Sequence, residues 1–148
     1  MSALKGSYKI TIDQKGRLSL PAKLRKANQS ASYDAFVITR GLEGCLFVFA
    51  ADEWGRIEEK LKNLSFTQND TRLFMRMLLS QATDATLDAQ GRIAIPRNLL
   101  DQAQLAKEKE VLVVGNLNRI EIWNTGVWDN YLKNSSKTYE QVAESILL

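Results

Sequence analysis

The chain has 148 residues, of which 45% are hydrophobic and 25% charged, which is enough apolar material for one ordinary core and excludes wholesale disorder. It has no histidine and a single cysteine, Cys45, which excludes an internal disulfide, a cysteine-rich metal site and hydrolase triads that need histidine. The net charge is +3, but residues 1–40 hold eight basic and two acidic residues, so this segment carries +6 and the other 108 residues carry −3.

The basic N-terminal segment is the first indication of a partner. A locally basic surface on a nearly neutral body favours binding to a polyanion, although a solvated face that binds nothing has the same composition. The longest apolar run, Cys45 to Ala51, is too short to cross a membrane, and the first nine residues lack the apolar stretch of a signal peptide. We therefore expect a cytoplasmic protein.

The first half of the chain predicts four strands and one short helix before residue 50. Alternating polar and apolar residues predict strands over 8–12 and 17–20, joined by "DQKG", a turn in which aspartate bonds back to the backbone and glycine accepts positive φ. Pro21 suits the first turn of a helix, which we expect over 22–27. The sequences "AFVIT" and "CLFVF" predict a hairpin. The order is strand, strand, helix, strand, strand.

Two helices are expected next, over 52–64 and 69–82. The second has apolar residues on more than one side, including Met75 and Leu79 as well as Leu73, Phe74, Met77 and Leu78. Such a helix is typically buried on more than one side. We expect it to be a well-buried internal helix, with the alternative that it also meets a neighbouring subunit.

The second half of the chain repeats the first. Residues at a spacing of 75 match between the two halves, and at a spacing of 74 the match continues through Gly41 with Gly115 and Trp54 with Trp128. The pairs at spacing 75 are Asp13 and Asp88, Gly16 and Gly91, Arg17 and Arg92, Leu18 and Ile93, Leu20 and Ile95, and Pro21 and Pro96. Each copy is one structural unit, too small to close a core alone. We expect the two copies to share one barrel-like core about a pseudo-twofold axis.

A last helix is expected over 138–148. Thr138 and Gln141 form a capping box at its start. Its apolar residues Val142, Ile146 and Leu147 could dock back on the chain or bind a partner.

The duplicated turns, "DQKGR" and "DAQGR", are the candidate functional sites. Arginine makes planar, bidentate contacts with guanine or phosphate, lysine supplies a point charge, and glutamine reaches adenine or a backbone oxygen. The alternative is an Asp13–Arg17 or Asp88–Arg92 pair that only steadies the turn. The expected DNA contacts are Lys15, Gly16, Arg17, Gln90, Gly91 and Arg92, with Lys5 and Lys9 as extra phosphate contacts. We expect the first copy to dominate because it is the more basic.

The chain resembles the MraZ family, of the AbrB/SpoVT-like class of DNA-binding proteins. The resemblance lies in "DQKGRLSLP", "RGLEGCLFVFAADEW", "DAQGRIAIP" and the strand that ends at Trp123, and it covers almost the whole chain. The chain departs from the family at its start, where Lys5 precedes Gly6 in place of the frequent aromatic residue and arginine.

The resemblance implies an α+β fold, a duplicated double-split β-α-β, swapped-hairpin-like barrel with added helices after each repeat. It assigns 7–54 and 83–126 to the two repeats, 55–82 to connecting helices and 127–148 to C-terminal helices. It implies a cytoplasmic, nucleoid-associated transcriptional regulator, most simply a repressor, of the division and cell-wall gene cluster. Such a protein binds short direct repeats of double-stranded DNA as a homo-oligomeric ring, without a cofactor, metal or membrane.

Two other functions are compatible with the residues. A ring-forming scaffold could use the same basic turns to grip acidic proteins. An enzyme could draw on Glu43, Glu121, Asp13 and Asp88, but these carboxylates do not stand in a recognisable catalytic frame, and a Gly-x-x-x-x-Gly-Lys phosphate loop is missing. We therefore expect no enzymatic activity.

Overall fold

The two sequence copies form the same series of elements. The computed structural model describes residues 3–25 and 34–147. The first copy consists of β1 (Ser7–Thr11), β2 (Arg17–Ser19), α1 (Ala22–Arg25), β3 (Ala35–Arg40), β4 (Leu46–Ala50), α2 (Ala51–Lys62) and α3 (Asn69–Leu79). The second consists of β5 (Thr83–Thr86), β6 (Arg92–Ala94), α4 (Arg97–Gln102), β7 (Glu110–Asn116), β8 (Arg119–Asn124), α5 (Thr125–Lys133) and α6 (Tyr139–Leu147). Positions 26, 27 and 148 of the expected helices lie outside the described residues.

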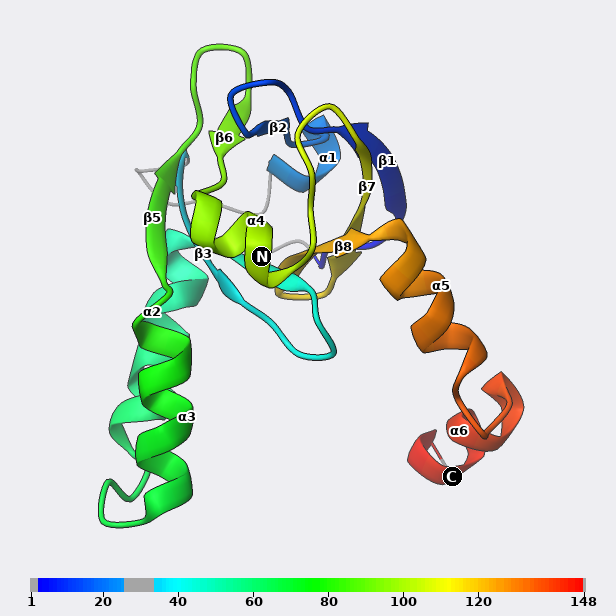
Figure 1. Cartoon of the computed structure of the whole chain (residues 1–148). Coiled ribbons are helices and arrows are strands. Elements are labelled where there is room, and N and C mark those ends of the chain that lie inside the picture. The colour runs from blue at the N-terminus through cyan, green and yellow to red at the C-terminus, as the bar shows by residue number, and fades with distance from the viewer. Residues whose placement is uncertain (1–2, 26–33, 148) are drawn as a thin grey trace.

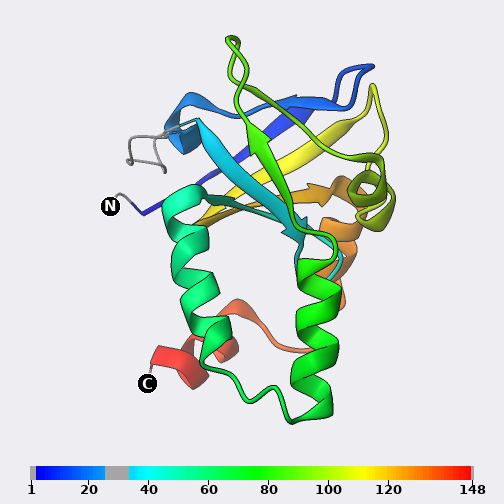
Figure 2. The same cartoon turned by 90° about the vertical axis from the view of Figure 1, so that its left-hand side faces the viewer.

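Strands are exchanged between the copies. In the six-stranded sheet, with order β1-β7-β8-β4-β3-β5, the first strand of each copy pairs with the third strand of the other, and all pairs are antiparallel. The second strands, β2 and β6, pair with each other in a separate ladder (Figures 1 and 2). The α+β class and the two repeats are therefore as expected. Closure of the sheets into a barrel stays a prediction, as do the expected segment boundaries.

The centre of the β2–β6 ladder marks the pseudo-twofold axis. Leu18 lies opposite Ile93, and Arg17 and Arg92 lie one residue to either side, opposite Ala94 and Ser19. Both central side chains are fully buried in a core to which both copies contribute. Other fully buried members of this core are Ile12, Leu20, Ile38, Leu46, Val48, Leu99, Val113 and Ile122. Since each such side chain contributes about 1.5–3 kcal/mol when buried, neither copy is a stable unit without the other.

The expected burial of the 69–82 helix is wrong. Only Leu78 of α3 is buried, while Leu73 and Phe74 are 57% and 45% exposed. The helix meets the sheet only near its C-terminal end, where the buried Thr39 hydroxyl donates a hydrogen bond of 2.8 Å to the carbonyl of Leu78. The rest of α3 runs away from the sheet, as α2 does (Figures 1 and 2), and the two helices stand apart in Figure 2. An apolar pattern on several sides therefore does not reflect burial within this chain.

The C-terminal helix also stands away from the sheets. Its capping box is present: the backbone N–H of Thr138 donates to the Gln141 side chain at 2.9 Å, and the N–H of Gln141 donates to the Thr138 hydroxyl at 3.2 Å. Its apolar side chains face solvent, and Tyr139 and Ile146 are 85% and 73% exposed. Among the helices in the described ranges, none has the length and apolar character to span a membrane.

Replacing Leu18 by alanine is expected to lower the free energy of unfolding by about 2–5 kcal/mol, because the change leaves a cavity on the axis shared by both copies. Urea denaturation followed by circular dichroism measures the loss. The control is Leu132→Ala on α5, where the side chain is exposed and the expected change is within about 0.5 kcal/mol. Equal losses in the two variants would contradict a core shared through β2 and β6.

Candidate nucleic-acid interface

The first turn is organised by the carboxylate of Asp13. One oxygen of this carboxylate accepts hydrogen bonds from the backbone N–H groups of Lys15 and Arg17, at 2.9 and 2.8 Å. The other accepts from Nε of Arg17 at 2.8 Å. Gly16 adopts a φ of +76°, a backbone conformation that glycine accepts at little cost. The turn is therefore closed by one side chain that contacts both its backbone and its arginine.

The second turn has the same geometry. Asp88 accepts from the backbone N–H groups of Gln90 and Arg92, each at 2.9 Å, and from Nε of Arg92 at 2.8 Å. Gly91 has a φ of +77°. The aspartate–arginine pair that steadies the turn, one of the two interpretations of the motif, is thus present in both copies.

The ion pair leaves the outer part of each guanidinium group accessible. Each aspartate contacts Nε, and the side chains of Arg17 and Arg92 are 30% and 25% exposed. Among the described residues, the terminal nitrogens of Arg17 have no hydrogen-bond partner within the chain. Nη1 of Arg92 lies 3.9 Å from the Asp13 carboxylate, so this acid connects the two turns. The arginines are oriented by their aspartates without being shielded from solvent.

Each turn is held in place by the opposite copy. The carbonyl of Gly16 accepts a hydrogen bond from the N–H of Ile95 at 2.9 Å, and the carbonyl of Gly91 accepts one from the N–H of Leu20 at 3.0 Å. These bonds extend the β2–β6 ladder to both turns. The two turns consequently emerge at the same end of the molecule (Figure 1).

Two basic residues that the sequence did not indicate lie against the turns. Lys107, between α4 and β7, has its Cε 3.8 Å from the position that a Cβ at Gly16 would occupy. Arg25 of α1 lies against Gly91. Each comes from the other copy, so neither is near its turn in sequence. In the sequence, only the comparison of the two copies distinguishes Arg25: the equivalent residue of the second copy, 75 positions later, is Leu100 and not a basic residue.

The two extra lysines are not gathered at the turns. Lys5 lies before the N-terminal end of β1, and the first turn follows the C-terminal end of the same strand. The length of β1, which rises about 3.3 Å per residue, therefore separates Lys5 from the turn. Lys9 is exposed halfway along β1. Their contacts with phosphate stay predictions.

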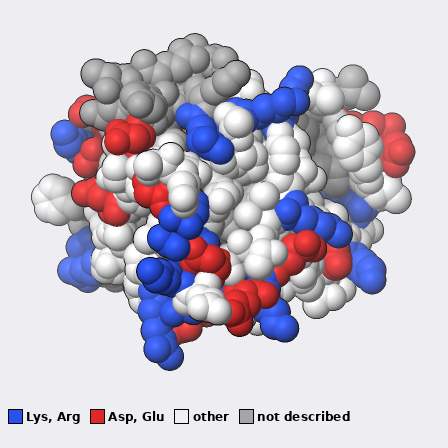
Figure 3. Space-filling model, turned by 90° about the horizontal axis from the view of Figure 1, so that it is seen from above, with Lys and Arg blue, Asp and Glu red and all other residues white. Residues whose placement is uncertain are grey.

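The face that carries the turns is not uniformly basic. Figure 3 shows it from above, with lysine and arginine side chains interspersed with acidic ones over the part that is described. The segment charge of residues 1–40 therefore does not form one continuous patch. Any contact with a polyanion must depend on a few oriented cations.

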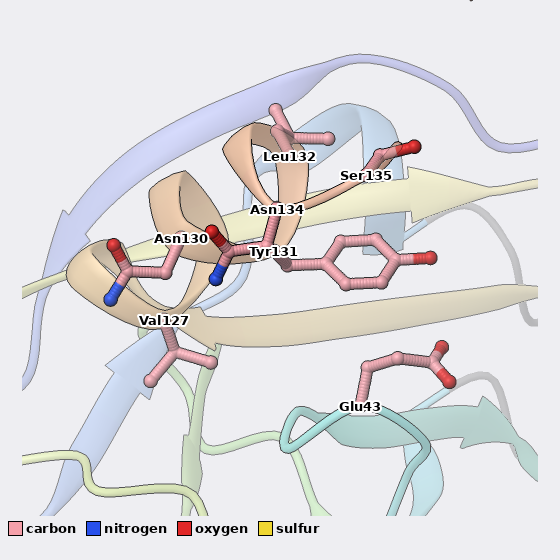
Figure 4. A pocket seen from close by; sticks show the side chains of 7 residues that line it. All are labelled: Glu43, Val127, Asn130, Tyr131, Leu132, Asn134 and Ser135. Carbon is pink, nitrogen blue, oxygen red and sulfur yellow. The ribbon is translucent and has the colours of Figure 1, made fainter. Parts of the chain in front are cut away.

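Three of the four carboxylates considered for catalysis have structural roles, and the fourth, Glu43, lies apart from them. Glu121 is buried and accepts hydrogen bonds from Asn116, Arg119 and Trp123, and Asp13 and Asp88 close the turns. Glu43 lines a hollow next to α5, across from Tyr131 and two asparagines (Figure 4).

Among the described residues, Cys45 is not a reactive thiol and the acidic residues do not form a metal site. Burial raises the pKa of the Cys45 thiol to about 12, so it is protonated at neutral pH. Within the ranges 3–25 and 34–147, no group of three or more histidine, cysteine or acidic residues could hold a metal ion.

Comparison with known proteins gives a consistent result over the whole chain. The family model described as "MraZ protein, putative antitoxin-like" matches twice, over residues 3–77 and 78–148. A protein named transcriptional regulator MraZ from Natranaerobius thermophilus is 44% identical over 142 residues, which cover 96% of this chain and 95% of that protein. Proteins of the same name from Alkaliphilus metalliredigens and Heliobacterium modesticaldum are 46% and 45% identical, covering 93% and 96% of this chain and 92% and 95% of theirs.

Acidification is expected to loosen both turns. The hydrogen bond from the Arg17 backbone lowers the pKa of Asp13 below its usual value of 3.8, and the bond from the Arg92 backbone does the same for Asp88. The stability that these carboxylates add is therefore fully present above that value and is lost as pH falls below it through the lowered pKa.

The measurement is thermal unfolding as a function of pH for the wild type and for a variant with both Asp13→Asn and Asp88→Asn. The wild type should be the more stable at neutral pH, and the difference should shrink below pH 3.8. A difference that stays constant down to pH 2, where ~99% of an ordinary aspartate is protonated, would contradict this role of the carboxylates.

Proposed function

The chain belongs to the MraZ family of transcriptional regulators, and we propose that it binds double-stranded DNA sequence-specifically through its two aspartate–glycine–arginine turns. The observation that carries the proposal is that two turns of the same geometry present guanidinium groups at one end of the molecule. Membership of this family also means that the chain is a regulator and not an enzyme.

The aspartates give each arginine a fixed direction before DNA arrives. An arginine held at Nε keeps its two terminal nitrogens for a planar acceptor pair, which is the geometry of contacts with guanine O6 and N7 or with two phosphate oxygens. Lys15 and Gln90, at equivalent positions of the two turns, supply a second contact of different chemistry. Gly16 and Gly91 are themselves buried, and they serve this binding through the positive φ that gives each turn its shape. Lys5 and Lys9 add phosphate contacts along the strand.

A single subunit presents few cations, so it binds DNA weakly and with strong dependence on salt. We infer that identical subunits form a ring that repeats the site at a fixed spacing. Short direct repeats at a matching spacing then gain affinity through effective concentration. In this proposal the protein acts in the cytoplasm, at the nucleoid, as a repressor of the division and cell-wall gene cluster.

Two exposed apolar surfaces on opposite sides of the molecule support a head-to-tail ring. A groove between α3 and the β3–β4 hairpin is lined by Arg40, Gly41, Leu42, Phe47, Phe74, Met77 and Leu78. Helix α6 lies on the other side (Figures 1 and 2) and exposes Tyr139, Val142, Ile146 and Leu147. A nine-residue helix is too short to be stable without a partner.

The charges of the two surfaces are complementary. Helix α6 carries Glu140 and Glu144 and no basic residue, whereas Arg40 borders the groove and α3 carries Arg72 and Arg76 against the single acid Asp70. Helix α6 of one subunit therefore suits the groove of the next. Contacts of this heterologous kind close into rings when the rotation between neighbours allows it.

Arg17→Ala and Arg92→Ala are each expected to weaken binding by about 1–3 kcal/mol, the usual cost of one lost bidentate contact. Binding to duplexes with and without direct repeats is measured by fluorescence anisotropy across a salt series. Arg97→Ala, which removes an almost fully exposed arginine outside both turns, is the control and should bind as the wild type does. A larger loss of affinity for Arg17→Ala than for Arg92→Ala would support dominance of the first copy, and equal losses would contradict that dominance.

The wild type also tests DNA binding itself. If it binds neither duplex DNA nor heparin at low salt, the proposal of DNA binding is overturned and the scaffold function remains.

The ring is tested by two variants that each damage one surface. Phe74→Asp and Ile146→Asp place a charge in the groove and on α6, and each alone should reduce the mass in solution, measured by analytical ultracentrifugation. Mixed in equal amounts, they should form a heterodimer, because each retains the surface that the other has lost. Variants that stay separate when mixed, or that keep the mass of the wild type, would contradict the head-to-tail contact.

A further inference from the structure

The two turns differ in their own cations. Lys15 stands next to Gly16 in the first turn, while the equivalent residue of the second turn is Gln90. The short helices differ in the opposite sense, since Arg25 of α1 is matched by Leu100 of α4. Because the copies exchange strands, Leu100 lies near Gly16, and Arg25 lies against Gly91. The turn that lacks a lysine is thus the one that receives an arginine.

The position of Arg25 is fixed by Leu20, the same residue that holds the second turn. Its Nε donates a hydrogen bond of 2.7 Å to the carbonyl of Leu20, and the N–H of Leu20 donates to the carbonyl of Gly91. This anchors the guanidinium group at Nε, as the aspartates do for Arg17 and Arg92.

The guanidinium group of Arg25 occupies the space that a side chain at position 91 would need. A Cβ built on Gly91 would lie 2.5 Å from Cζ and 2.7 Å from Nη1 of Arg25. At Gly16 the closest atom is a carbonyl oxygen at 3.4 Å, and no cation lies as near. Gly91 therefore admits both the positive φ of the turn and the close approach of a second guanidinium group.

The surroundings of Arg25 leave its charge available. A hollow beside the turn is lined by Arg25, Asp34, Leu87, Asp88, Ala89 and Gly91. Asp88 already accepts three hydrogen bonds within its turn. Within the described ranges, Arg25 forms no ion pair with Asp34 or Asp88. Of its nitrogens, only Nε is engaged by a described residue.

We propose that Arg25 contacts a DNA phosphate at the second turn and supplies there the charge that Lys15 supplies at the first. This inference rests on the proposed function, because it assumes that the turns bind DNA. Arg25 and Arg92 then stand at the second turn as Lys15 and Arg17 do at the first, where Lys107 of the second copy adds a further cation. The exchange also reduces the charge difference on which the expected dominance of the first copy depends.

The test compares Arg25→Gln, Arg25→Lys and Lys23→Gln. Glutamine keeps an N–H donor for the Leu20 carbonyl but removes the charge, whereas lysine keeps the charge. Lys23→Gln removes an exposed charge from the same helix. The probe is a mixed-sequence DNA duplex, and the readouts are the slope of log affinity against log salt and the melting temperature of each variant.

Arg25→Gln is expected to reduce the magnitude of the slope by about 0.9, the value for one lost phosphate contact, with little change in melting temperature. Arg25→Lys and Lys23→Gln should keep the slope of the wild type. If Arg25→Gln fails to fold, Arg25→Met, which keeps an unbranched side chain of similar length without the charge, takes its place: a reduced slope supports the proposal and the slope of the wild type overturns it.

Two other outcomes are decisive. A folded Arg25→Gln protein with the slope of the wild type would show that Arg25 only supports the turn, and would leave the proposed function intact. A wild type that binds no duplex would instead refute the proposed function itself.

Discussion

The exchange of strands between the two copies is the constraint on which the rest of the molecule depends. The β2–β6 ladder has Leu18 and Ile93 at its centre, and it ends on each side with a glycine carbonyl of one turn bonded to the backbone of the other copy. A turn that protrudes from a sheet is ordinarily mobile. Here the opposite copy fixes both turns, and one fully buried core supports them.

The aspartate of each turn has two opposing effects on binding. It neutralises part of the arginine charge, which weakens attraction to a polyanion. It also fixes the guanidinium group in advance, and an arginine side chain carries about 2 kcal/mol of rotamer entropy that binding would otherwise cost. An exposed ion pair stabilises a fold by only about 0–1 kcal/mol, so orientation is its larger contribution. A site built this way favours geometric selectivity over affinity, which fits the proposed repetition of the site in a ring.

The sequence predicted local structure well and spatial neighbours poorly. The order of elements, both turns and the Thr138–Gln141 capping box follow from residue types and short spacings, which act locally. Burial of α3 was wrongly predicted because an apolar pattern on several sides of a helix does not show that the helix packs against the sheets of its own chain. The positions of Lys107 and Arg25 were missed because they follow from the pairing of β2 with β6, and a repeat does not reveal whether its copies pack side by side or exchange strands.

The net charge of a sequence segment therefore does not predict where its charged side chains lie on the folded protein. Of the basic residues in 1–40, Lys15 and Arg17 belong to the first turn, Arg25 lies on the second, Lys5 stands at the far end of β1, and Arg40 borders the groove next to α3. Acidic side chains are interspersed with basic ones over the described part of the upper face (Figure 3). The second turn has Gln90 where the first has Lys15, and Arg25 of the first copy brings a cation to it. Gly91 makes room for that cation, so the repeat retains its glycine for a reason that the turn alone does not require.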